Sequence, residues 1–139
     1  MDRLEAHRDY LDAAWRAALA APLSVRKAML VAALIDAYVD RQFAALPEPD
    51  DILEFRAGLA ARSPALAPVF ALCAWREGGP RPVIEAVPVP IADYGTLSVE
   101  DFMVSLYNDH SVQRLRLVLP DGTRLDMLAT LGEAIAALG

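Results

Sequence analysis

Apolar side chains recur every three or four positions through the first 77 residues, which is the spacing of one face of an α-helix. Breaks that carry proline, at Pro22, Pro47 and Pro64, divide this pattern into four segments. A short polar residue that can cap a helix stands at the start of each segment. The N-caps that we expect for the four helices are Asp2, Ser24, Asp51 and Ser63.

The second of these predicted helices is apolar on every side between Ala28 and Ile35. A helix without a polar face over two turns has to be covered from several directions. We therefore expect this stretch to lie at the centre of the helical layer. Other helices, or a second subunit, are expected to cover it completely.

The helical spacing of apolar residues ends after Gly78, and the sequence from Val83 to Ile91 favours an extended conformation. Pro88 and Pro90 stand two positions apart, so they remove amide donors from the same lateral side of a strand. A strand of this kind cannot pair on that side. We predict an edge strand whose outer edge is blocked against further pairing.

A fifth helix is predicted from the Ser98 cap through Asn108. Its apolar positions share one face. They are Val99, Phe102, Met103 and Leu106.

Alternation from Val112 to Leu119 predicts a strand with its leucines turned inward, and the Pro120–Thr123 turn predicts a β-hairpin. The return strand is expected from Arg124 to Leu128. A final short helix is expected to begin at Thr130, with Glu133 completing a capping box.

Together these elements predict an α+β fold with an N-terminal four-helix layer, followed by an edge strand, a helix, a β-hairpin and a short C-terminal helix. A chain of 139 residues has the commonest size of one domain. We therefore predict a single domain over residues 1–139. Its helical half spans residues 1–77 and its strand-bearing half spans residues 83–139.

The formal net charge is −6, and the acidic residues are scattered along the chain. A nucleic-acid partner is not expected, because phosphate would be repelled. The longest apolar run is far too short for a membrane span, so no membrane partner is expected either. The single cysteine, Cys73, lies in an apolar stretch where a buried and inert thiol is expected. We predict a cytoplasmic protein.

Asp36, Tyr38 and Asp40 form the most suggestive polar group, because residues four apart share a helix face and two carboxylates could hold a cation. Such a site needs further oxygen ligands, and no Glu-x-x-His pair accompanies the group. No metal is therefore predicted. The other interpretation is that both aspartates face water and pair with Arg26 or Arg41, or that they bind an arginine of another helix.

The two histidines have no local partners for metal binding or proton transfer. We expect His7 to be exposed on the first helix and His110 to end the fifth one. No serine stands in a Gly-x-Ser-x-Gly turn and no glycine loop opens a helix, so no catalytic residue and no cofactor is predicted.

Four large aromatic side chains are expected in the core or half-buried, although they could also line a pocket or a groove for a partner. The four are Trp15, Trp75, Tyr94 and Tyr107. The candidate ligand-binding residues are His7, Trp15, Asp36, Tyr38 and Asp40.

The excess of apolar residues and the lack of a catalytic constellation favour a homodimeric protein-interaction module. The alternative is a small-molecule binding protein or a small enzyme, with a cleft between the helical layer and the sheet. A further alternative is a chaperone-like protein that shields an apolar segment of a protein partner.

Overall fold

The computed structural model describes residues 2–139, which form six α-helices, one short 3-10 helix and a three-stranded antiparallel sheet. The α+β fold class predicted from the sequence is confirmed, as is the order of its elements. The first four helices are α1 (Arg3–Ala20), α2 (Val25–Ala44), α3 (Ile52–Arg62) and α4 (Leu66–Cys73). The later elements are β1 (Arg81–Pro88), η1 (Ile91–Thr96), α5 (Val99–Tyr107), β2 (Ser111–Val118), β3 (Arg124–Asp126) and α6 (Met127–Ala137).

Most of the predicted helix starts are confirmed by side-chain caps. Asp2 and Glu5 form the reciprocal capping box of α1, and the Ser24 hydroxyl accepts from an amide of the first turn of α2. The exception is α4, where the N-cap is Ala65 and no side chain caps the helix. Ser63 instead ends α3, so the predicted cap of the fourth helix was wrong.

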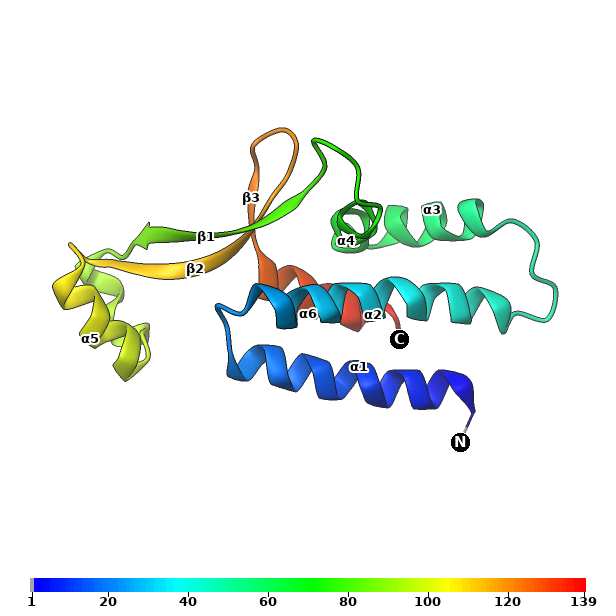
Figure 1. Cartoon of the computed structure of the whole chain (residues 1–139), viewed down its shortest axis with the longest axis horizontal. Coiled ribbons are helices and arrows are strands. Elements are labelled where there is room, and N and C mark those ends of the chain that lie inside the picture. The colour runs from blue at the N-terminus through cyan, green and yellow to red at the C-terminus, as the bar shows by residue number, and fades with distance from the viewer. Residues whose placement is uncertain (1) are drawn as a thin grey trace.

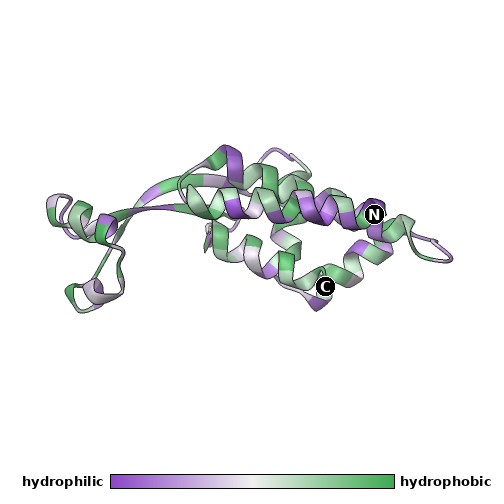
Figure 2. Ribbon diagram, turned by 90° about the horizontal axis from the view of Figure 1, so that it is seen from below, coloured by the Kyte–Doolittle hydropathy of each residue, from purple (hydrophilic) through white to green (hydrophobic). Residues whose placement is uncertain are grey.

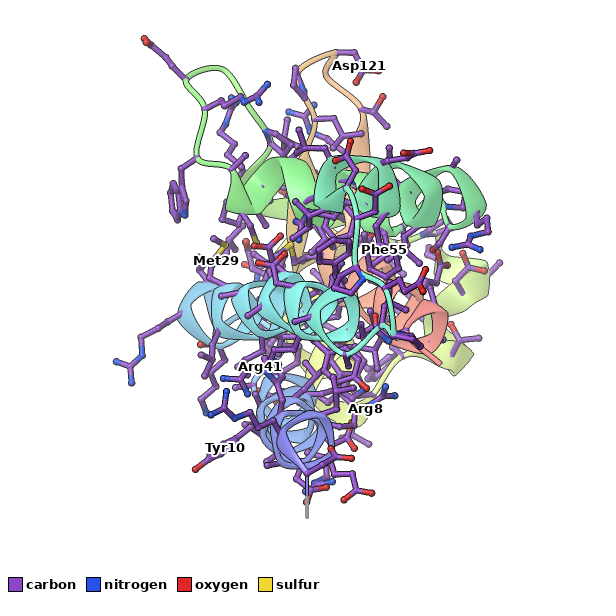
Figure 3. The ribbon with its side chains drawn as sticks, turned by 90° about the vertical axis from the view of Figure 1, so that its right-hand side faces the viewer. Arg8, Tyr10, Met29, Arg41, Phe55 and Asp121 are labelled. Carbon is purple, nitrogen blue, oxygen red and sulfur yellow. The ribbon has the colours of Figure 1, made fainter. Side chains whose placement is uncertain are left out.

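Helix α2 forms the centre of the helical body (Figure 1). Helix α1 packs along one side of it, α3 and α4 along the opposite side, and α6 behind it (Figures 1 and 3). Side chains of β2 join the same hydrophobic core, which therefore draws on both the helical and the strand-bearing half. Large side chains that are completely enclosed include Leu11, Ile35, Leu66, Leu117 and Leu131.

The apolar stretch at the middle of α2 is open to solvent along one stripe. Leu30 is 52% exposed and Ala33 is also exposed, so the other helices of this chain do not enclose the whole stretch, and cover by a second subunit stays a prediction. Helices α1, α3, α4 and α6 pack on the other sides of α2. The buried members of the stretch are Ala28, Val31, Ala32 and Ile35.

The sheet has the order β1-β2-β3, so β1 is an edge strand as predicted. The amide of Val89 donates to the carbonyl of His110 at 2.6 Å, on the side of β1 that faces β2. Because amides alternate between the two sides of a strand, Pro82, Pro88 and Pro90 lie on the opposite, free side. The predicted block on that edge is therefore present.

The predicted turn between β2 and β3 is confirmed. The amide of Leu119 donates to the carbonyl of Thr123 at 2.8 Å, and Gly122 has a φ of +88° that favours glycine. The carboxylate of Asp121 accepts from the amide of Thr123, which holds the pKa of Asp121 below its ordinary value.

Helix α6 begins four residues earlier than predicted, because its N-cap is Asp126 and not Thr130. Asp126 accepts from the amide of Ala129 at 2.8 Å and so caps a helix that starts at Met127. Thr130 lies inside the helix with a buried side chain, so the predicted capping box was wrong and the return strand ends at Asp126. The early start places Met127 in the core.

Strands β1 and β2 form a two-stranded arm that leads away from the helical body and carries η1 and α5 at its end (Figure 1). Eight paired residues in each strand correspond to about 26 Å, and the part of the strands nearer α5 projects because Leu115 and Leu117 of β2 lie in the core of the body. Seen from below, α5 and its flanking loops stand apart from the helices of the body (Figure 2). Among residues 2–139, no helix combines the length and the apolar character that crossing a bilayer requires.

Candidate functional site

Asp36 and Asp40 of α2 both contact Arg56 of α3. The guanidinium donates to the Asp36 carboxylate, and its Nη1 atom lies 2.9 Å from Oδ1 of Asp40. The same guanidinium lies over the ring of Phe70, 4.2 Å from its centroid. The interpretation in which an arginine of another helix binds these aspartates is therefore confirmed. This cluster ties α2, α3 and α4 together, and within residues 2–139 no three acidic, histidine or cysteine side chains gather as a metal site.

His7 is buried, so the prediction of an exposed helical histidine was wrong. Its Nε2 atom lies 2.7 Å from the carbonyl oxygen of Leu34, and its ring meets the edge of Tyr38. His7 shares a face of α1 with Leu11 and Ala18, and that face packs on α2. The adjacent Arg8 also approaches Tyr38, with its guanidinium carbon 5.8 Å from the ring centroid.

Trp15 is half-buried between α1 and α6, as expected for a large aromatic side chain. Its ring approaches Gly132 so closely that a Cβ atom there would lie 3.2 Å from it. None of the five candidate ligand residues lines the hollow between the α1–α2 turn and the arm. The structure thus places Asp36 and Asp40 on the same arginine and His7 against Tyr38. It does not bring the five residues together. Ligand binding by them stays a prediction.

A hollow of about 500 Å³ lies between the helical layer and the strand-bearing half. The α1–α2 turn, the first turn of α5 and the base of β2 form its walls. Two of its charged groups are paired, because Nη2 of Arg114 donates to Asp101 at 3.1 Å, and Asp126 caps α6. The hollow has the position expected of a cleft between the two halves, but its residues are not those that the sequence suggested.

Cys73 is half-buried at the end of α4, so the prediction of a buried thiol was only partly right. Burial, together with the nearby Asp36 carboxylate, raises the pKa of Cys73 from 9.0 to about 11, although the Arg56 guanidinium opposes the shift. The thiol is therefore protonated at neutral pH.

We expect Cys73 to react with iodoacetamide at pH 7.5 about a hundredfold more slowly than a free thiol, because a pKa two units higher leaves a hundredth of the thiolate. The alkylation rate, measured by mass spectrometry, should keep rising through pH 10. The same chain in urea is the control and should react at the ordinary rate. A folded-state rate that levels off below pH 9 would contradict the assignment.

Helix α5 exposes its apolar face to solvent at the end of the arm. The sequence correctly placed these side chains on one helix face, but nothing in residues 2–139 covers it. Only Ser105 of this helix is buried, and Phe102 packs edge-on against Tyr94 of η1. The outward side chains and their exposed fractions are Val99 (81%), Met103 (48%), Leu106 (50%) and Tyr107 (83%).

Residues 91–110 are here called the arm head, and hydrogen bonds fix the conformation of this segment. The amide of His110 donates to the carbonyl of Ser105 at 3.0 Å, and its imidazole contacts the hydroxyl of Tyr94. Asp109 and His110 both have positive φ, which ends α5 and returns the chain to β2, as predicted for His110. The head therefore presents α5 as an ordered surface.

The arm head is acidic as well as apolar. It contains Asp93, Glu100, Asp101 and Asp109 but no lysine or arginine. Of these four, Asp101 is paired with Arg114 at the base of the head. The head therefore presents a locally negative surface around its apolar face.

No family model, curated protein or solved structure matches the chain. Its function must therefore be inferred from its own surface and chemistry.

Two aromatic side chains expected in the interior are instead on the surface. Trp75 is 78% exposed because α4 ends at Cys73 and the chain turns at Trp75 with a φ of +53°. Tyr107 is exposed on the arm head. The sequence contained one signal that the arm head exposes apolar side chains. Residues 102–107 are apolar on several sides of a short helix, and one neighbouring surface cannot cover all of those sides.

Proposed function

We propose that this chain is a protein-interaction module that acts as a homodimer, with the arm head as its contact surface. The observation that carries the proposal is the exposed apolar face of α5 at the end of the arm. An ordered helix that keeps several large apolar side chains in water is characteristic of a binding surface. Burying that face against a partner removes the unfavourable contact with water.

The rigidity of the arm head supports the same proposal. Association costs free energy when flexible segments become ordered, and a surface that is already ordered avoids much of that cost. The Tyr94 and His110 contacts hold α5 against the end of the sheet before any partner is present. A symmetric pair buries two such heads in one assembly, which favours a closed dimer. A cytoplasmic location is part of the proposal, supported by Cys73 as the one cysteine and a free thiol.

Light scattering after size-exclusion chromatography tests the proposal directly. At a few tens of micromolar, which is about the range in which an ordinary interface holds, we expect twice the chain mass of 15.1 kDa. Dilution should return the mass toward that of one chain. The mass of a single chain at every concentration up to about 100 µM would overturn the proposal. It would mean that the free energy of association is weaker than about 5.5 kcal/mol.

A further inference from the structure

The packing around α2 leaves one face of the helical body open. Its exposed side chains, here called the α1–α2 face, come from two stripes with the same spacing. The α1 stripe is Tyr10, Ala13 and Ala17, and the α2 stripe is Leu30, Ala33 and Ala37. Figure 3 shows Tyr10 and Arg41 on this side of the body, and Arg8 on the other side, toward α6.

Small side chains predominate on the α1–α2 face. Its alanines let the backbone of another helix approach closely. Leu30 (52% exposed) and Tyr10 (73% exposed) are its large apolar side chains. Four of its six side chains are alanines, so a helix with larger outward side chains, such as Met103 and Leu106, would fit it.

The charge around the α1–α2 face is opposite to that of the arm head. Arg26, Lys27 and Arg41 are exposed beside it, and the ion pairs among residues 2–139 do not include them. The two stripes themselves contain no acidic residue. The exposed acids at their margins are Asp40, which is paired with Arg56, and Asp9 of α1, so the three bases outnumber the unpaired acids there. An acidic arm head therefore has an attractive counterpart on this face.

Charge also selects between two ways of pairing the heads. A head placed against another head would bring two sets of four acids together, in a chain that already carries a net charge of −6. A head placed on the α1–α2 face brings acids to bases instead. The arm of the same chain cannot supply that head, because it projects beyond the α1–α2 turn, away from the face (Figure 1).

We infer that the arm head of each protomer binds the α1–α2 face of a second copy, so that two protomers exchange arms reciprocally. The inference rests on the proposed homodimer and specifies where the partner receives the head. The strands extend over about 26 Å, and because Leu115 and Leu117 of β2 lie in the core of the body, the arm projects with the part of the strands nearer α5. A two-fold axis makes the two contacts between head and face equivalent, so the assembly closes on itself.

A mixing experiment tests the exchange. The arm variant carries Met103→Glu and Leu106→Glu, and the face variant carries Ala33→Glu and Ala37→Glu. The matched control carries Ala57→Glu and Ala61→Glu, which place the same charges at the same spacing on exposed positions of α3. Each variant is labelled with a different fluorophore and studied by analytical ultracentrifugation, alone and in a one-to-one mixture.

We expect the arm variant and the face variant each to be monomeric alone, with at least about a hundredfold weaker association, a loss of roughly 2.7 kcal/mol. Mixed together, they should form a heterodimer, since the intact head of the face variant meets the intact face of the arm variant. The control should dimerise like the unchanged chain. Dimerisation should also weaken as salt is raised from 50 to 500 mM, because the charges are screened over about 10 Å at 0.1 M.

The outcomes separate this inference from the proposed function. If the face variant dimerises as tightly as the unchanged chain while the arm variant is monomeric, the exchange is overturned and the homodimer stands. A mixture that stays monomeric also overturns the exchange. If the unchanged chain is itself monomeric, the proposed function fails.

Discussion

Met103→Glu together with Leu106→Glu is expected to abolish the proposed dimer at micromolar concentrations while the helical body stays folded. Both side chains lie on the outward face of α5, about half exposed in the single chain, so their replacement costs the folded protomer little. In the proposed dimer the same positions lose apolar contact and bury carboxylates against alanine and other apolar side chains, which is unfavourable by several kcal/mol. We expect the dissociation constant to rise at least about a hundredfold.

Sedimentation equilibrium measures this change, and the helical circular dichroism signal with its thermal midpoint reports on the fold. The control is Leu53→Glu, which adds a carboxylate at a 75% exposed leucine of α3, far from both surfaces in the proposal. The control should leave association unchanged. A double arm variant that still dimerises with unchanged affinity would remove α5 from the interface.

Ile35→Ala should lower the free energy of unfolding by about 2 to 5 kcal/mol, whereas Leu30→Ala should lower it by less than about 0.5 kcal/mol. Both residues lie in the apolar stretch of α2, but Ile35 is fully enclosed and Leu30 is 52% exposed. Removing methyl groups from an enclosed position leaves a cavity, and at an open position water takes their place.

Urea unfolding followed by circular dichroism gives both free energies. The two substitutions are compared in the monomeric arm variant, because dimerisation would add its own stabilisation and Leu30 lies on the α1–α2 face. Equal losses at the two positions would mean that the stretch is enclosed on every side after all.

Local signals in the sequence predicted most of the fold because local interactions decide the element boundaries. The Ser24, Asp51 and Ser98 caps satisfy amides within three residues, and the turn around Gly122 needs only its own residues. The start of α6 was missed because Asp126 and Thr130, about one helical turn apart, are both residues that can cap a helix. Only the packing of Met127 in the core distinguishes them.

The candidate site was harder to predict, because periodicity shows which side chains share a face but not what covers that face. Helix α2 buries apolar side chains at this spacing, such as Ile35, whereas α5 leaves them exposed, such as Leu106. The Asp36–Arg56 contact joins residues 20 positions apart, so no spacing rule could select Arg56 from the other arginines. The buried position of His7 likewise depends on where α1 meets α2.

The prolines of β1 bear on how far assembly can proceed. On the free edge of this strand, between Pro82 and Pro88, only the amides of Ile84 and Ala86 remain as donors. Another β-strand added there would find half of its carbonyls without hydrogen-bond partners. The free edge of β1 therefore resists the addition of strands that would extend the sheet into fibrils, although the arm exposes the apolar face of α5.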